Sequence, residues 1–555
     1  MICSGKYKPV KTIELPTRTW PDKKINKAPK WCSVDLRDGN QALVNPMGIN
    51  AKVDFFDMLV KIGFKEIEVG FPSASTTEYN FVRRLITENK IPDDVSIQVL
   101  CQSREDLVLK TLTSVRGAKN VIFHIYNSTS PAQRKYTFGR TKEQTIELAR
   151  EGVRCIKKSL NAQELSHIQL EYSPESFTMT EIDFALEICE AVKEEWFKDN
   201  CSTKKIIFNL PATVECYMPN VFADQVEYFS THISEREKVI VSVHNHNDRG
   251  EGVASCEMGL LAGAERVEGC LFGNGERTGN LDIVTCALNM FSTGVDPELD
   301  FSDLPQIACQ YEKLTGMFIP PRTPYAGALV FTAFSGGHQD AIRKGMSARS
   351  VMDKNELWDV PYLLIDPHDI GREYEDIIRI NSQSGKGGAS FVLENDYGIS
   401  IPKAMQPALG NVVKNFADSV QREISSAEVY RLFQNQWITK QDKFQIVDIV
   451  ETNLDSSNAE VSNVRAVVCI NGQNYSIGDK GNGPLDAFCN ALKQTPVCAF
   501  NVTAFHEHSA GEGTNSLAFA YVQITTENGE KFWGVGKSTS IGRAGIAAVA
   551  SALNQ

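Results

Sequence analysis

Between residues 31 and 305, short apolar stretches alternate with longer amphipathic segments, and this alternation limits the possible folds more than any other feature of the chain. The apolar stretches are rich in β-branched residues, as in 238–244, which predicts buried strands. The segments between them carry apolar residues three and four positions apart, as in 53–62, which predicts helices. The expected strands are 31–37, 66–71, 96–101, 120–126, 167–172, 205–210, 238–244 and 266–272.

Eight strand-and-helix units within about 250 residues have the size of a closed (β/α)8 TIM barrel. We therefore expect an α/β fold with a parallel barrel as its first large domain. The alternative is an open, doubly wound sheet. Such a sheet commonly carries a Gly-x-Gly-x-x-Gly sequence after its first strand, and this chain has none there.

The rest of the chain divides into three further sections around this barrel, which is expected at 31–305. Residues 306–435 have helical periodicity and are expected to form helical linker subdomains, and residues 436–555 a small α+β domain. Residues 1–30 are expected to form an extended N-terminal arm without a helix, because they contain Pro9, Pro16, Pro21 and Pro29.

The C-terminal section shows an internal duplication. Residues 475–492 and 532–553 each read as a strand, a turn and a helix that ends in a similar sequence. His506 and His508 lie between them and are either metal ligands or, more simply, exposed polar residues at a strand end.

Two glycine-containing loops are expected in the linker section. One, at 335–340, places His338 beside two glycines. The other, at 381–388, has the composition of a phosphate-binding loop but lacks the spacing of that motif, so a hinge is an equal interpretation.

The charge and cysteine content exclude several classes of partner. The net charge is −12 and the basic residues are scattered, so neither a nucleic acid nor an acidic membrane is an expected partner. No run approaches the roughly 20 apolar residues of a membrane span, and the N-terminus has no apolar signal core. The 14 cysteines form no Cys-x-x-Cys pair, which is typical of reduced thiols in a cytoplasmic protein.

His244 and His246 end the seventh expected strand and can point to the same side of it, because residues two apart on a strand share a face. In a closed barrel the seventh, eighth and first strands are neighbours. Asp38 follows the first strand and Asn280 follows the eighth, so both side chains can converge on the two imidazoles. Two nitrogen and two oxygen donors predict a site for a divalent metal ion: Mg²⁺, with Zn²⁺ or Mn²⁺ as alternatives. Taken singly, each residue also has a structural interpretation as a cap or turn.

Three sequences, in this order, closely resemble the signatures of 2-isopropylmalate synthases, which belong to the acetyl-CoA-dependent Claisen-condensing enzymes. They are Asp35-Leu-Arg-Asp-Gly-Asn-Gln41, His244-Asn-His-Asn-Asp248 and Gly273-Asn-Gly-Glu-Arg-Thr-Gly-Asn280. The resemblance runs through essentially the whole chain after the arm. Further sequences, at 172–175, 209–214, 335–340 and 381–388, are similar to the long-form branch of that family.

The resemblance implies condensation of acetyl-CoA with 3-methyl-2-oxobutanoate and water to give 2-isopropylmalate and CoA, the first committed step toward leucine. A divalent metal ion would hold the keto and carboxylate oxygens of the 2-oxo acid. Arg37 would donate to the oxyanion that forms. The family pattern places His124, Ser173 and Thr213 around the 2-oxo acid.

The acetyl methyl group must lose a proton, and the sequence offers several candidates for the base. These are Glu175, Glu276 and His338, with Tyr362 as a partner of His338. The resemblance implies that His338 and Tyr362 lie on a segment that reaches over a barrel mouth, that of the other subunit. The sequence does not decide among the candidates.

The C-terminal section resembles the leucine-sensing regulatory domain of the family, which implies a homodimer inhibited by leucine. The expected leucine site consists of Gly481, Asn482, Gly483, Pro484, Leu485, Ala487 and Tyr521. A tight turn explains the glycines equally well.

Other activities are compatible with the metal ligands alone. A citramalate or homocitrate synthase would share them, and so would a metal-dependent aldolase or lyase on the same barrel. A non-catalytic amino-acid-binding protein is a third possibility, but it would have no reason to keep a buried charged cluster.

Overall fold

The computed structural model describes residues 10, 12–198, 204–349, 356–374, 386–420, 424–438, 443–453, 461–510 and 516–555. The chain forms two compact units. The first consists of Met1–Phe331 and Leu364–Glu373, and the second of Thr332–Leu363 and Tyr374–Gln555.

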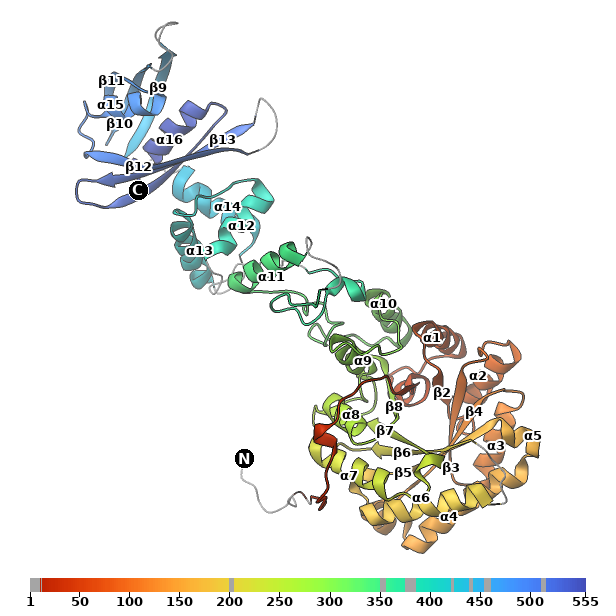
Figure 1. Ribbon diagram of the computed structural model, residues 1–555. Coiled ribbons are helices and arrows are strands. Elements are labelled where there is room, and N and C mark those ends of the chain that lie inside the picture. The colour runs from red at the N-terminus through yellow and green to blue at the C-terminus, as the bar shows by residue number, and fades with distance from the viewer. Residues whose placement is uncertain are drawn as a thin grey trace. The chain divides into compact units, whose positions relative to one another are not determined.

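The first unit is the expected barrel (Figure 1). Its eight strands form a closed ring in chain order, and each pairs in parallel with its neighbours. The ring closes where β1 pairs with β8, from Lys30 opposite Arg266 to Ser33 opposite Gly269. The strands are β1 (Lys30–Ser33), β2 (Glu66–Gly70), β3 (Ser96–Gln102), β4 (Val121–Ser128), β5 (Ile168–Glu175), β6 (Ile206–Ala212), β7 (Val239–Asn245) and β8 (Arg266–Gly269).

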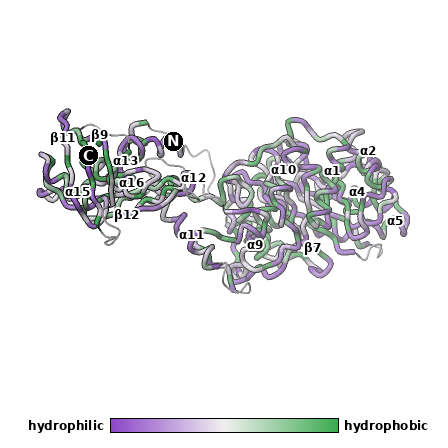
Figure 2. Tube along the Cα trace, turned by 90° about the horizontal axis from the view of Figure 1, so that it is seen from above, coloured by the Kyte–Doolittle hydropathy of each residue, from purple (hydrophilic) through white to green (hydrophobic). Residues whose placement is uncertain are grey.

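Helices cover the outside of the ring, and their apolar faces explain why. In α4, for example, Ala149, Val153 and Ile156 are buried at three- and four-residue spacings, and a Thr141–Gln144 capping box fixes the helix start. Hydrophobic and hydrophilic residues accordingly interleave along the chain (Figure 2). The helices are α1 (Ile49–Ile62), α2 (Thr76–Thr87), α3 (Glu105–Val115), α4 (Lys142–Ser159), α5 (Ala162–Ser166), α6 (Ile182–Phe197), α7 (Pro219–His232), α8 (Gly252–Leu261), α9 (Ile283–Ser292) and α10 (Leu304–Thr315).

The first and last strands are shorter than the sequence predicts. β1 ends at Ser33, and Asp35–Gly39 form a helical turn instead of continuing the strand. β8 ends at Gly269, because the chain then bends through Phe272, whose φ is +55°. The side chain of Asp35 accepts a hydrogen bond from Leu271 N at 3.1 Å and holds the two bends together. The bends bring the residues after both strands over the mouth of the barrel.

The N-terminal arm lies against α7. Arg18 donates two hydrogen bonds of 2.6 Å to Asp224, and Trp20 Nε1 donates a third at 2.8 Å. The expectation that the arm contains no helix is wrong in one detail, because Trp20–Asp22 form a single 3-10 turn. Pro21 fits there because the first helical turn leaves its backbone N–H groups unpaired anyway.

The second unit begins with helices and ends in two three-stranded antiparallel sheets. Each sheet is followed by one helix, so the internal duplication is confirmed. The elements are α11 (Gly336–Arg349), α12 (Lys386–Tyr397), α13 (Gln406–Val420), α14 (Ser426–Phe433), β9 (Phe444–Asn453), β10 (Ser462–Ile470), β11 (Gln473–Gly481), α15 (Pro484–Leu492), β12 (Phe500–Ala510), β13 (Leu517–Thr526), β14 (Lys531–Ser538) and α16 (Ile541–Leu553).

Two local predictions for this unit are wrong. Residues 335–340 do not form a loop, because α11 begins at Gly336 and includes His338. His506 and His508 do not end a strand but lie within β12, where His508 stacks against Phe519 and Tyr521. Of the expected loop at 381–388, residues 381–385 lie outside the described residues, and residues 386–388 belong to α12.

The sheet of β12, β13 and β14 has a hydrophobic core on each face. One face packs with α15 and α16 through Ala520 and Val522, and the other packs with α12, α13 and α14 through Phe519 and Tyr521. β13 is therefore buried on both sides. In the part of the chain that the structure describes, no helix is long and apolar enough to cross a membrane.

Candidate active site and metal centre

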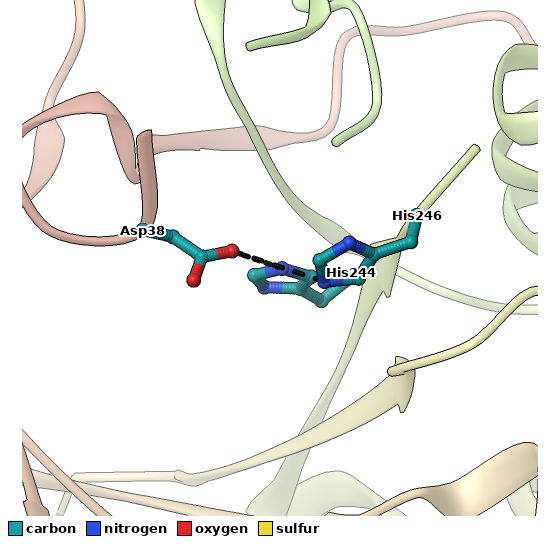
Figure 3. Close-up of side chains that lie close together, drawn as sticks. All are labelled: Asp38, His244 and His246. Carbon is teal, nitrogen blue, oxygen red and sulfur yellow. Dashed lines mark ion pairs between the residues drawn. The ribbon is translucent and has the colours of Figure 1, made fainter. Parts of the chain in front are cut away.

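Asp38, His244 and His246 converge at the mouth of the barrel (Figure 3). His244 is the penultimate residue of β7, His246 follows the strand, and Asp38 lies on the turn after β1. The Oδ2 atom of Asp38 is 3.4 Å from His244 Nε2 and 3.8 Å from His246 Nε2. All three side chains are at least 90% buried, so they form a compact cluster of possible ligands inside the protein.

Asn280 joins this cluster from the other side of the β1–β8 seam. Its Oδ1 lies 3.0 Å from His244 Nε2, and its Nδ2 donates to Asp38 Oδ2 at 3.0 Å. The preceding loop folds tightly enough to bring it there because of its glycines. A Cβ on Gly279, whose φ is +99°, would lie 2.0 Å from Gly273 O, and one on Gly275 would lie 2.5 Å from Asn280 Nδ2.

The protonation states of Asp38 and His246 suit a cation. Burial lowers the pKa of His244, but hydrogen bonds to Asp38 and Glu268 outweigh it and raise that pKa to about 10, so His244 would release a proton when a cation binds. Burial raises the pKa of Asp38, but Arg37 and the two histidines outweigh it and hold that pKa well below its usual range. Burial and the neighbouring His244 lower the pKa of His246 to about 4, so its ring is neutral. Its Nδ1 has no hydrogen-bond partner among the described residues. An anionic carboxylate, a neutral imidazole, a second imidazole and an amide oxygen fit the donor set of a divalent metal ion.

Glu268 fixes the orientation of His244. Its Oε2 lies 2.7 Å from His244 Nδ1, which leaves Nε2 directed at Asp38 and Asn280. Glu268 is itself held by three donors at 2.8 to 3.0 Å, which come from Gln98, Asn209 and Arg266. These groups are buried inside the ring, so the barrel interior fixes the orientation of the His244 imidazole.

A second group of possible ligands, Glu68, His124 and Glu268, lies deeper in the barrel. The amide of Gln98 occupies the space between them. Its Nε2 donates to Glu68 and Glu268 at 2.8 Å each and lies 3.3 Å from His124 Nδ1. This group is therefore a closed hydrogen-bond network rather than a second metal centre.

Arg37 is fixed between two carboxylates at the edge of the metal cluster. Its Nη1 donates to Asp38 Oδ1 at 2.6 Å, and its Nε donates to Glu68. The guanidinium still lines the cavity at the barrel mouth. Glu68 was not predicted from the sequence. It lies within an apolar strand, and the sequence does not show whether its side chain points into the barrel or toward the helices.

The cavity has a volume of about 260 Å³ and collects most of the predicted site residues. The predicted residues that line it are Arg37, Asp38, His124, Ser173, Glu175, Thr213, His244, His246 and Glu276, whereas Asn280 contacts His244 without lining the cavity. Sequence reasoning assigned no site role to the remaining lining residues, although four of them lie within the family motifs. They are Gln41, Asn209, Pro211 and Arg277 in the motifs, and Phe71, Leu100 and Tyr126 outside them.

The polar groups on one wall of the cavity are linked to each other. His124 Nε2 lies 2.7 Å from Ser173 Oγ, and Asn209 Nδ2 donates to the same oxygen at 3.1 Å. Thr213 Oγ1 accepts from Ser176 N at 2.9 Å, so its hydroxyl hydrogen remains available to a ligand. The wall thus offers several donors close together.

The two cavity glutamates are held differently. Glu175 accepts a hydrogen bond from Ser128 Oγ, and Glu276 accepts one from Gln41 Nε2 at 3.0 Å.

His338 and Tyr362 belong to the second unit, where their rings stack with centroids 4.0 Å apart. Tyr362 is 64% exposed, and its φ is +66°. The role of this pair over a barrel mouth stays a prediction.

The residues expected to bind leucine are only partly brought together. Asn482 N donates to Asp486 at 3.0 Å, which closes the turn before α15. Gly481 must be glycine, because a Cβ there would lie 2.3 Å from Ala487 N. Ala487 and Tyr521, however, pack into the cores on opposite faces of the β12–β14 sheet. Within one chain they therefore do not share a pocket, and the leucine site at the expected dimer interface stays a prediction.

Comparison with known proteins extends over the whole chain. Residues 28–310 match the HMGL-like family model, 328–394 the model of the α-isopropylmalate synthase post-catalytic domain, and 423–555 that of the LeuA allosteric (dimerisation) domain. The 2-isopropylmalate synthase of Clostridium acetobutylicum is 51% identical over 557 residues, which cover 99% of both chains. That of Acetoanaerobium sticklandii is 50% identical over 551 residues, which cover 99% of this chain and 96% of the relative. That of Schizosaccharomyces pombe is 48% identical over 567 residues, which cover 100% of this chain and 96% of the relative. Together with the closed barrel and the carboxylate and imidazole cluster at its mouth, these matches show that the chain belongs to the 2-isopropylmalate synthase family.

Proposed function

We propose that this protein condenses acetyl-CoA with 3-methyl-2-oxobutanoate and water to give 2-isopropylmalate and CoA, the first committed step toward leucine. The observation that supports this most is the joint placement of Arg37, Asp38, His244 and His246 at one cavity. Asn280, the fourth candidate ligand, is hydrogen-bonded to this group. A divalent metal ion, which we infer to be Mg²⁺, would polarise the keto group of the 2-oxo acid.

The residues of the barrel can bind and orient the 2-oxo acid. Thr213 and Ser173 would donate hydrogen bonds to its carboxylate. Arg37 would donate to the keto oxygen, which becomes an oxyanion when the new carbon–carbon bond forms. The apolar side chains of Phe71, Leu100 and Pro211 line the same cavity and would contact the isopropyl group.

A base must remove a proton from the acetyl methyl group before the carbon attacks. Glu175 and Glu276 both line the cavity, and His338 with Tyr362 remains the alternative from the second unit. The carbanion then bonds to the keto carbon, the oxyanion takes up a proton, and water cleaves the thioester to release CoA. Each candidate can be tested by its effect on exchange of the acetyl protons with solvent, which needs the base but not the condensation.

A panel of 2-oxo acids tests the proposal. With purified protein, acetyl-CoA and Mg²⁺, release of free CoA should be fastest with 3-methyl-2-oxobutanoate. It should fall by about tenfold or more with pyruvate and 2-oxoglutarate, because the first lacks the branched group and the second brings a charge against Leu100 and Phe71. A clear preference for pyruvate would instead indicate citramalate synthesis, and one for 2-oxoglutarate homocitrate synthesis. No CoA release with any of the three would refute the proposal.

We infer further that the enzyme is a homodimer that leucine inhibits, and that it works in the cytoplasm. Residues 423–555 match the allosteric dimerisation domain of the family, which supports the first inference. All cysteines among the described residues are free thiols, which supports the second. Leu485 lines a cavity of about 640 Å³ beside α15 and is the best-placed apolar contact among the predicted leucine ligands.

Replacing Leu485 with alanine should weaken inhibition by leucine about tenfold, because the methyl groups of the ligand lose an apolar contact. Leucine dose–response curves of CoA release measure this change. The uninhibited kcat should stay within twofold of wild type. If both proteins are inhibited equally, or if leucine does not inhibit the wild type, this assignment of the regulatory site is wrong.

A further inference from the structure

The loop after β4, which includes a short helical segment at Gln133–Phe138, is basic and aromatic, and the reaction described so far gives it no role. No acidic residue occurs between Pro131 and Lys142, although the whole chain carries a net charge of −12. Tyr136 is 77% exposed and Phe138 46%. The cationic side chains of this segment are Arg134, Lys135, Arg140 and Lys142.

Two of these four cations share one carboxylate, and the other two pair with none among the described residues. Arg134 and Lys142 pair with Glu181 at 2.7 and 3.5 Å. Within the part of the chain that the structure describes, no carboxylate pairs with Lys135 or Arg140. Their charged groups instead lie over aromatic rings, with Lys135 Nζ 4.8 Å from the centroid of Tyr136 and Arg140 Cζ 5.3 Å from that of Phe138. The loop thus presents two uncompensated positive charges beside exposed rings.

The base of this loop is fixed to the rim of the catalytic cavity. Arg134 Nε donates to Thr129 O at 3.0 Å, and Thr129 Oγ1 donates to the backbone oxygen of Glu175 at 3.0 Å. Glu175 itself lines the cavity. The backbone N–H of Arg140 donates to Arg134 O at 2.9 Å and closes the loop on itself. The charges therefore lie on a structured loop whose base is bonded to a residue that lines the cavity.

We propose that Lys135, Tyr136 and Arg140 bind the adenosine 3′-phosphate 5′-diphosphate end of acetyl-CoA. This inference rests on the proposed function, because it assumes acetyl-CoA as the co-substrate. The phosphate groups of CoA give it a high negative charge, which suits one Lys and one Arg without other partners. Its adenine is a flat ring that can stack on Tyr136. The long pantetheine arm then connects this surface with the cavity.

The double variant Lys135→Ala with Arg140→Ala tests the proposal in the full-length enzyme. Its KM for acetyl-CoA should rise about tenfold or more, because two charge-assisted contacts to phosphate are lost. The kcat and the KM for 3-methyl-2-oxobutanoate should stay within twofold, since neither residue touches the reacting atoms. The KM for acetyl-pantetheine, which has no adenosine and no 3′-phosphate or diphosphate, should be the same in variant and wild type. Raising the NaCl concentration should increase the KM for acetyl-CoA in the wild type more than in the variant.

A matched control removes two positive charges elsewhere on the barrel. Lys61→Ala with Lys158→Ala changes exposed lysines of α1 and α4 and should leave all these constants unchanged. If the control raises the KM for acetyl-CoA equally, the effect comes from net charge and the proposal is wrong. It is also wrong if the loop variant changes that KM by less than twofold, or changes the KM for acetyl-pantetheine as much. Failure of the proposed function would look different, because the wild type itself would then release no CoA.

Discussion

Replacing Asp38 with asparagine should lower the rate of CoA release by about a thousandfold or more and should abolish metal binding at millimolar Mn²⁺. The substitution keeps the size of the side chain but removes the only carboxylate within 4 Å of both His244 and His246 among the described residues. A hard divalent cation depends strongly on such a charged oxygen donor. Calorimetric titration with Mn²⁺ and a steady-state assay of free CoA measure the two effects independently.

Controls for this variant separate loss of the ligand from loss of the fold. Asp94→Asn changes an exposed carboxylate that pairs with Lys65 and should leave metal binding and activity unaltered. The circular dichroism spectrum of the Asp38 variant should match that of the wild type, because Arg37 keeps Glu68 as a partner. Treating the wild type with a chelator should reproduce the loss of activity, and adding Mg²⁺, Mn²⁺ or Zn²⁺ separately will show which ion restores it best. A variant that keeps wild-type metal affinity would exclude Asp38 as a ligand.

Replacing Arg37 with lysine should lower kcat by about a hundredfold or more while changing the KM of either substrate by only a few fold. The guanidinium lines the cavity and is held by Asp38 and Glu68, so its remaining N–H groups are fixed where the keto oxygen gains charge. Loss of one such donor typically reduces kcat by 10² to 10³, roughly. Lysine keeps the charge but cannot make both carboxylate contacts and donate to the substrate.

The distribution of the effect between kcat and KM is the informative measurement for Arg37. A donor that acts mainly on the oxyanion changes kcat, whereas one that only binds the ground state changes KM. Metal affinity should stay close to that of the wild type. Arg154→Lys on the outer surface of α4 provides the matched control and should change neither constant. If the Arg37 variant changes KM alone, its role is substrate binding and not stabilisation of the oxyanion.

The barrel could be predicted from the sequence because its strands are buried on both sides and so form continuous apolar runs between amphipathic helices. The positions of Asp38, His244, His246 and Asn280 followed from the rule that side chains at the carboxyl ends of neighbouring strands meet. The hydrogen-bond network in the barrel interior could not be predicted from the sequence. Residues such as Gln98 and Glu268 are polar groups inside strands, and only the closed ring shows that they contact each other.

The second unit shows why other details escaped prediction. Ala518 to Val522 are all buried, so the strand gives no alternation from which the direction of Tyr521 could be read. The sequence likewise did not show that Ala487 and Tyr521 pack into different cores of one chain. At 335–340, the glycines suggested a loop, but a helix tolerates them in its first turn.

The pairing of β1 with β8 has a consequence for how the protein is made. Asp38 and Asn280 are 242 positions apart in the chain, yet the amide of one donates to the carboxylate of the other. A ribosome-bound chain that stops before the eighth strand lacks the candidate ligand Asn280. It also lacks the pairing of β1 with β8 that positions Asp38. Metal affinity therefore reports that the ring is complete, and nascent chains of increasing length should gain it only after residue 280 has left the exit tunnel.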